Sequence, residues 1–436
     1  MNLSDEQVLA MAPDESSRKS GKDLSNPAKW VSKGANEQAL WGECQGSGSK
    51  PYQTQIDRIS MAFKCSCPSR KFPCKHGLGL LLLYSRQQVV FTEQTPPSWV
   101  SEWLAQRTEK VEKKAIPVPE KKMDPTVPTK RLEARQQKVS DGADELLRWM
   151  KDLVRNGIMD MPERDHSFFE NMIRRMVDAQ ASGLAGMLRE LANTSFYQDG
   201  WQTLFLEQLI RIYLVVQGYQ HLGQLPLALQ QDIRNMAGFT QSQEELKEQT
   251  GVKDTWQILG KQTTEEDRLV TERYWLYGIH TQRSAMVLQF YVRGQGIPPS
   301  QALFPGSTIQ AELVFYPSAA PLRALVKQQI TLPPNPAFGG YPGWQEVMKA
   351  QTALSEVLPV YGDRLYTVAS LVPVWHEERW WLQDGRQQLM PVKKDFPHIW
   401  KLLALSGGRS LHMAVTGRNR QYEPIGVWHE QEYKIL

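Results

Sequence analysis

Several features that would place this chain in a familiar class of protein are missing from its sequence. The longest apolar run, Gly77 to Tyr84, has eight residues, whereas a membrane-spanning helix needs roughly 20. The first residues are acidic and contain no apolar core, so we expect no signal peptide. These absences favour a cytoplasmic protein without a membrane segment.

Motifs of common enzyme classes are also absent. The sequence contains no G-x-x-x-x-G-K-[ST] phosphate-binding loop and no G-x-S-x-G nucleophile turn. His376 lacks a second histidine at the spacing used by zinc proteases. We therefore expect no ATPase and no enzyme, and an unrecognised catalytic site in residues 140–436 is the weakest of three hypotheses.

Cysteine is scarce and unevenly placed. Of the four cysteines, Cys65, Cys67 and Cys74 fall within ten residues, and Cys44 lies upstream of them. In a reducing compartment such a cluster indicates a metal site rather than disulfides. We interpret Cys44 as a small buried apolar residue.

The formal net charge of +4 hides a strong asymmetry along the chain. Residues 50–86 hold seven basic and one acidic side chain, and residues 107–138 hold ten basic and five acidic side chains. The remainder, from 139 to 436, has a net charge of −3. A nucleic acid, if one binds, would contact residues 50–86 and be aided by the basic segment after 106.

Length and composition predict an α+β protein of several domains. We expect an N-terminal region (1–106), a disordered linker (107–138), a central helical domain (139–250) and a mostly antiparallel β domain (251–436). The linker carries four prolines and fifteen charges among few apolar residues, so it cannot bury enough surface to fold.

Within the N-terminal region we expect a short helix over 4–12, a polar loop over 13–27 and a compact unit over 28–92. Apolar residues in 93–106 recur at the spacing of one helical face, which should pack back on that unit. These residues are Trp99, Val100, Trp103 and Leu104.

The two later domains differ in hydrophobic period. Four amphipathic segments separated by polar joints predict a bundle: from about 140, then 166–180, 184–191 and 204–214. Beyond 252 we expect strands at 273–278, 285–291, 311–316, 410–415 and 421–428, a hairpin at 380–389, and one helix at about 343–357. Asp384-Gly385 suits the tight turn of that hairpin.

The decisive segment is 63–77, which contains Cys65, Cys67, Cys74 and His76 in the spacing C-x-C-x6-C-x-H. Three thiolates and one imidazole fill the four tetrahedral positions that zinc prefers. A C-x-C pair at the end of a strand places both thiols on one side of a sheet, and the leucine-rich run that follows is predicted to be a buried helix. Because four protein ligands leave no open position, we expect one structural Zn²⁺ whose binding is part of folding.

Basic residues surround these ligands, and Phe63 and Phe72 lie among them. The basic residues are Lys64, Arg70, Lys71 and Lys75. They suit a face that contacts phosphates while the aromatic rings stack on bases. They also offset the three thiolates, and they are equally candidates for contact with a protein partner, so these interpretations stay open.

Tryptophan is abundant, with fourteen residues. Five of them lie in the β region: Trp375, Trp380, Trp381, Trp400 and Trp428. A tryptophan-rich core explains them, and an aromatic binding surface is the alternative, because exposed tryptophans anchor interfaces. Trp380 and Trp381 are adjacent, so they face opposite sides of a strand, and one of them is a candidate for exposure.

Residues 50–90 resemble the SWIM-type zinc finger. The resemblance rests on the ligand spacing, the Cys-Pro-Ser turn at 67–69 and the Phe-Pro-Cys-Lys-His sequence at 72–76, followed by the leucine-rich run. A weaker similarity to bacterial SWIM proteins of this length extends over the chain. It implies a small ββα zinc module that binds DNA or protein, and partners of the MoxR-type AAA ATPase and von Willebrand A classes.

Two functional hypotheses therefore lead. The first is a zinc-binding, non-enzymatic adaptor that contacts protein partners. The second is a nucleic-acid-binding protein that uses the basic zinc module at residues 50–86.

Overall fold

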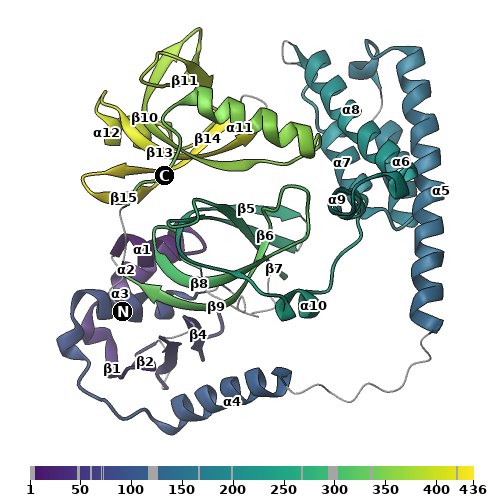
Figure 1. Cartoon of the computed structure of the whole chain (residues 1–436). Helices are drawn as coiled ribbons and strands as arrows, with labels where there is room; N and C mark the ends of the chain where they lie inside the picture. The colour runs from purple at the N-terminus through teal and green to yellow at the C-terminus, as the bar shows by residue number, and fades with distance from the viewer. Residues whose placement is uncertain are drawn as a thin grey trace.

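The computed structural model describes residues 5–46, 50–58, 61–69, 71, 73–115, 126–164, 167–197, 200–266, 269–292, 303–333, 337–418 and 421–436. Figure 1 shows a small N-terminal sheet with its helices, a group of helices along α5 (Thr126–Asn156), and two β units stacked one above the other. The predicted α+β class is confirmed. No helix among the described residues combines the length and the apolar character that a bilayer requires.

The N-terminal module is built on an antiparallel sheet of order β1–β2–β3–β4. Its strands are β1 (Trp30–Ala35), β2 (Ala39–Cys44), β3 (Tyr52–Asp57) and β4 (Ala62–Cys65). Because successive side chains point to opposite faces, Leu40 packs with α3 (Lys75–Arg86), whereas Trp41 packs with α4 (Ser98–Ala115). The predicted ββα unit is thus β3, β4 and α3, and the expected apolar face of α4 covers the other side of the sheet.

The prediction of a polar loop over residues 13–27 is wrong, because most of this segment is helical. After α1 (Asp5–Ala10), α2 (Glu15–Leu24) begins at an N-cap, where Asp14 Oδ1 accepts a hydrogen bond of 2.7 Å from the backbone N–H of Ser17. The sequence of α2 contains only one large apolar residue, Leu24, so it shows no row of apolar residues. The helix is held by close packing on α3, since a Cβ at Gly21 would lie 2.9 Å from the Cβ of Leu78.

The prediction of a disordered linker over residues 107–138 is wrong at both ends of that segment. Helix α4 continues to Ala115, and α5 begins at Thr126, while residues 116–125 lie outside the described chain. Tertiary contacts hold the part of this stretch around Arg135. The guanidinium of Arg135 donates to Gly238 O at 2.9 Å and lies over the ring of Phe239, so a charged stretch is held against the bundle despite its composition.

The central region is the expected helical bundle. Beside α5 it contains α6 (Ser167–Asp178), α7 (Ser182–Ala192), α8 (Trp201–Gln220), α9 (Leu227–Ala237) and the short α10 (Gln243–Glu248). The apolar residues that predicted α8 divide between two faces. Leu209 is buried in the bundle core, whereas Leu206 and Ile210 are exposed.

The first β unit is a closed barrel of five strands in the order β7–β6–β5–β8–β9. The strands are β5 (Val252–Glu266), β6 (Leu269–Gly278), β7 (Ser284–Val292), β8 (Thr308–Phe315) and β9 (Ala324–Leu332). The long β5 pairs with both β6 and β8 and carries an irregularity between Ile258 and Gly260. The barrel closes where Met286 N–H donates to Leu322 O at 2.8 Å, beside a parallel bridge to Arg323.

The second β unit repeats this connectivity. Its strands are β10 (Arg364–His376), β11 (Arg379–Gln383), β12 (Leu389–Pro391), β13 (Leu411–Arg418), β14 (Gln421–His429) and β15 (Glu432–Ile435), in the order β12–β11–β10–β13–β14–β15. Again the first strand is long, irregular between Val368 and Leu371, and paired on both sides. Again the third and fifth strands meet in parallel, with Lys393 N–H donating to Tyr422 O at 2.8 Å.

Helices and core complete the second barrel. The expected helix near 343–357 is α11 (Trp344–Val357), whose Trp344 is buried in the barrel core. A further helix, α12 (Ile399–Ser406), lies between the third and fourth strands and buries Leu402 in the same core. Two successive barrels with this strand order have the connectivity of the five-stranded Greek-key OB fold.

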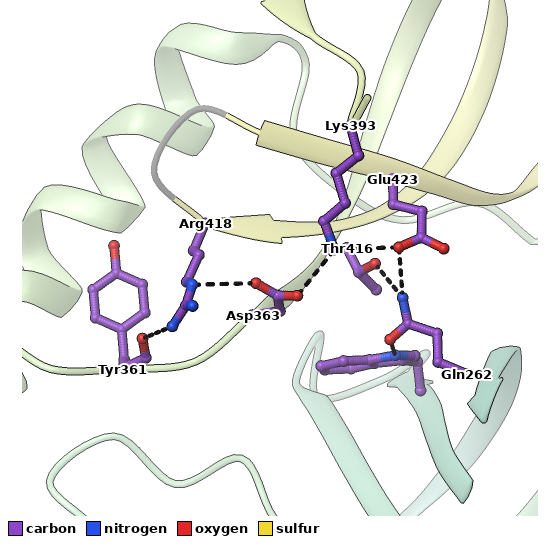
Figure 2. Close-up of polar contacts among 8 residues, drawn as sticks. Gln262, Tyr361, Asp363, Lys393, Thr416, Arg418 and Glu423 are labelled. Atoms are coloured by element: carbon purple, nitrogen blue, oxygen red, sulfur yellow. Dashed lines mark hydrogen bonds and ion pairs between the residues drawn. The ribbon is translucent and has the colours of Figure 1, made fainter. Parts of the chain in front are cut away.

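The two barrels pack side by side through apolar outer faces. Trp275 and Tyr277 of the first barrel contact a cluster from the second that includes Leu365 and Ile425. Figure 2 shows the polar edge of this interface, where Gln262 Nε2 donates to Thr416 Oγ1 and Glu423 Oε2, and Lys393 bridges Glu423 and Asp363. The expected antiparallel β domain is therefore a pair of docked barrels.

Candidate metal centre

The four predicted ligands come from two elements and the segment between them. Cys65 is the last residue of β4, Cys74 is the N-cap of α3, and His76 lies in the first turn of that helix. Cys67 lies just beyond the end of β4. The end of a strand and the start of a helix thus converge, which confirms the expected arrangement of two closely spaced ligand pairs.

The geometry of these groups fits one tetrahedral metal ion. The three Sγ atoms and one imidazole nitrogen all lie within 4.8 Å of one another, and Cys65 Sγ lies 3.7 Å from His76 Nδ1. Ligands at zinc–sulfur distance from a tetrahedral ion are separated by ~3.8 Å. Soft thiolates favour zinc over oxygen-preferring cations such as Mg²⁺ or Ca²⁺. Cys65, Cys67, Cys74 and His76 are therefore positioned to bind one zinc ion.

Hydrogen bonds from the protein surround the sulfur atoms. Gly77 N–H donates to Cys74 Sγ at 3.5 Å, as expected for a side chain that caps a helix. Thr54 Oγ1 lies 3.2 Å from Cys65 Sγ, because Thr54 on β3 is the register partner of Cys65 on β4. Such outer contacts orient the ligands and stabilise negative charge on sulfur.

The pKa values of the ligand groups also indicate that the site favours a bound cation. Hydrogen bonding to Cys65 and Cys67, together with burial, raises the pKa of Cys74 far above its ordinary value, whereas hydrogen bonds with Cys65 and Cys74 lower the pKa of Cys67. Burial would lower the pKa of His76, but the thiols beside it outweigh burial and raise this pKa to about 9. Without a metal the four groups must share protons, and a bound zinc ion removes that competition because it takes thiolates and neutral imidazole.

The metal centre is continuous with the core of the module. His76 and eight following residues of α3 are buried, and the leucines among them pack on the sheet. A Cβ at Gly77 would lie 2.9 Å from the ring of Phe63, so the helix start is pressed against β4. A zinc ion bound here would join the α3 N-terminus to the end of β4, so metal binding is expected to be part of folding.

The basic residues around the ligands do not form one free patch. Lys71 Nζ lies 2.7 Å from Asp14 Oδ2 at the start of α2, and this partner lowers the pKa of Asp14 to about 2. Lys64 and Lys75 are exposed, and neither pairs with a carboxylate among the described residues. Arg70 and Phe72 lie outside the described residues.

The fourth cysteine is not among the four groups that converge on one metal position. Cys44 is fully buried in the apolar cluster between the sheet and α3. Burial raises the pKa of its thiol to about 11. The prediction of a small buried apolar residue is confirmed. Thr54, by contrast, was missed, because its approach to Cys65 depends on a strand pairing that local spacing does not reveal.

Comparison with known families identifies two segments of the chain. Residues 61–85 match the SWIM zinc finger, and residues 134–237 match a SWIM-associated four-helix bundle domain. The first match covers β4 and most of α3, and the second covers α5 to α9. No curated protein and no solved structure matches the chain. The chain thus carries a SWIM zinc finger, as its resemblance implied.

Proposed function

We propose that this protein is a non-enzymatic adaptor whose zinc-held module binds protein partners. The observation that carries the proposal is the closed Cys₃His site. Catalytic zinc keeps a position open for water or substrate, whereas four protein ligands make the ion structural. The metal then serves to hold a surface in shape. Three reduced thiols suit a reducing compartment, so we place this adaptor in the cytoplasm.

Charge pairing around the site supports a protein partner over a phosphate backbone. Lys71 faces Asp14 within the chain, so one of the expected cations is already partly neutralised. The helical region from 139 to 250 holds sixteen acidic and ten basic side chains, which would repel a polyanion at close range. MoxR-type AAA ATPases and von Willebrand A proteins are the partner classes that the resemblance to bacterial SWIM proteins implies, and we propose them for this chain.

Nucleic-acid binding by the zinc module is the second candidate. Its support is the excess of basic side chains in residues 50–86 and the exposure of Lys64 and Lys75. Both side chains remain available for phosphate contacts. Lys71 would add to such a face only if its ion pair with Asp14 were broken.

Affinity capture at two salt concentrations separates the two candidates. The tagged full chain, the Cys65→Ser/Cys74→Ser double variant and Cys44→Ala are compared, the last serving as a matched cysteine control away from the metal. An adaptor keeps its ATPase or von Willebrand A partner from 50 to 200 mM salt and loses it in the double variant alone. Phosphate-driven binding with several contacts falls by about 10³-fold over the same range. Failure of the wild-type chain to retain either partner class contradicts the adaptor.

A further inference from the structure

The second barrel presents one sheet face that no described element covers. This face, called here the β10–β12 face, consists of the outward side chains of β10, β11 and β12. Its members are Val372, Val374, His376, Arg379, Trp381, Gln383, Leu389 and Pro391. All of them are half-buried or exposed. In an OB fold, these first three strands form the surface that receives oligonucleotides and oligosaccharides.

Strand register places these side chains in rows across the sheet. Trp381 lies between Val374 on one neighbour and Pro391 on the other, and Arg379 lies opposite His376. Cross-strand neighbours on one face are close enough for their side chains to touch. The β10–β12 face is therefore an apolar floor with an indole at its centre and a cation at one end.

In the first barrel, the corresponding sheet face is covered by the neighbouring barrel. Trp275 lies on the second strand of the first barrel, as Trp381 does on the second strand of the second. It is only 1% exposed, because the neighbouring barrel covers it, and its Nε1 donates to Gln262 Oε1 beside the network in Figure 2. The corresponding face of the second barrel keeps its tryptophan without such a cover.

The side chains around Trp381 suit stacking on a base. The guanidinium of Arg379 lies 4.8 Å from the Trp381 ring centroid, and the indole Nε1 donates to His376 O at 2.9 Å, which fixes the plane of the ring. Arg379 pairs with no carboxylate among the described residues. Trp375 is 59% exposed and packs edge-on against Trp380, but the strand register places both on the other side of the hairpin, so they are not part of this face. Aromatic rings with stacked arginines are how single strands are held without sequence preference.

Charge favours a nucleic acid at this end of the molecule more than at the bundle. Residues 364–436 hold ten basic and seven acidic side chains. Glu377 and Glu378 form the turn at the tip of the β10–β11 hairpin. Because these carboxylates repel phosphates, we expect base stacking on Trp381 to supply most of the binding, with Arg379 as the cation that neutralises a phosphate.

We propose that the β10–β12 face binds single-stranded nucleic acid, with Trp381 stacking on a base and Arg379 contacting the adjacent phosphate. This site is distinct from the zinc module. Binding at this site is independent of the adaptor function, because the site uses neither the metal ligands nor Lys64 and Lys75.

Fluorescence anisotropy with labelled 20-nucleotide oligo-dT and oligo-U tests this site on the zinc-loaded full chain. We expect both single strands to bind, and the matching duplex to bind more weakly. Replacing one stacking ring weakens single-strand binding by about ten-fold or more, so Trp381→Ala should show that loss. Arg379→Ala should weaken binding as well, and it removes no core contact, which guards against a folding artefact.

Two control variants make the result specific. Trp400→Ala removes a tryptophan that is 76% exposed on α12, which is not one of the three strands of the β10–β12 face, and should leave the affinity unchanged. Lys64→Glu with Lys75→Glu alters the zinc module, and binding that this pair abolishes while Trp381→Ala spares it would lie on the zinc module and overturn the proposal. Absence of binding by the wild-type chain overturns the proposal and leaves the face as a protein surface. Equal affinity of wild type, Trp381→Ala and Arg379→Ala overturns it too.

Discussion

Lys71 Nζ lies 2.7 Å from Asp14 Oδ2, so the loop between the second and third zinc ligands is fastened to the first turn of α2. The same carboxylate caps that helix through Ser17 N–H. One aspartate thus joins the helix that sequence patterns missed to the loop that carries the metal.

Removal of this contact should loosen the metal site without abolishing it. Lys71→Ala keeps all four ligands, so we expect full zinc occupancy but faster release to a chelator, because the loop gains freedom to move. Stopped-flow transfer of zinc to a coloured chelator measures the rate. Lys64→Ala, an exposed lysine with no carboxylate partner among the described residues, is the matched control. Equal release rates in Lys71→Ala and wild type would show that the ion pair does not restrain the loop.

Two glycines of α7 should respond in opposite directions to the same substitution. A Cβ at Gly183 would lie 2.0 Å from Met236 O of α9, whereas a Cβ at Gly186 would meet nothing within 4 Å. Gly183→Ala should therefore destabilise the bundle by about 1–3 kcal/mol through overpacking. Gly186→Ala should stabilise it by about 0.5–1 kcal/mol, because alanine loses less backbone entropy in a helix. Urea unfolding measures both, and a destabilised Gly186→Ala would contradict the packing of α7.

The Asp254 carboxylate should make the first barrel sensitive to acid. Burial raises its pKa, but hydrogen bonds from the backbone of Thr255 and His280 and from both donors of Thr281 outweigh burial and lower it. A carboxyl whose pKa is lower in the folded state stabilises the fold above its unfolded pKa of about 3.9, and this stabilisation is lost as the pH falls through the folded value.

The measurement is the difference in melting temperature between wild type and Asp254→Asn as a function of pH. The variant keeps the shape of the side chain and removes the charge. We expect the wild type to be more stable at neutral pH and the difference to shrink below about pH 4. Zinc loss at low pH affects both proteins alike and cancels in the difference. A difference that stays constant from pH 7 to pH 3 would rule out the charged hydrogen-bond network.

Local patterns predicted the metal ligands and most helices. Cys65, Cys67, Cys74 and His76 lie close in sequence, so their spacing alone constrains one coordination sphere. The apolar face formed by Val100, Trp103 and Leu104 was predicted, because apolar residues of an amphipathic helix recur every three to four residues. Helix α2 was missed because it has only one large apolar residue, Leu24, and its stability comes from packing on α3.

The features of the fold that the sequence did not predict depend on contacts between residues far apart in the chain. The pairing of Met286 with Arg323, just before β9, and of Val392 with Tyr422 closes the barrels, and neither contact leaves a periodic signal. Strands β5 and β10 were not separately predicted, because an irregularity in each interrupts the alternation of buried and exposed side chains. The exposure of apolar residues on α8 was not predicted either, because apolar spacing indicates a helix but not which of its faces other elements cover.

The most direct test of the structural zinc centre is elemental analysis combined with unfolding of the purified chain. Protein prepared without chelator should contain one zinc per chain, and the same should hold for Cys44→Ala. Cys65→Ser with Cys74→Ser should contain none, and the N-terminal module should lose its protection from proteolysis, because structural zinc contributes about 10–16 kcal/mol to folding in small zinc modules. A zinc content near zero in the wild type, or an intact module in the double variant, would contradict the metal centre.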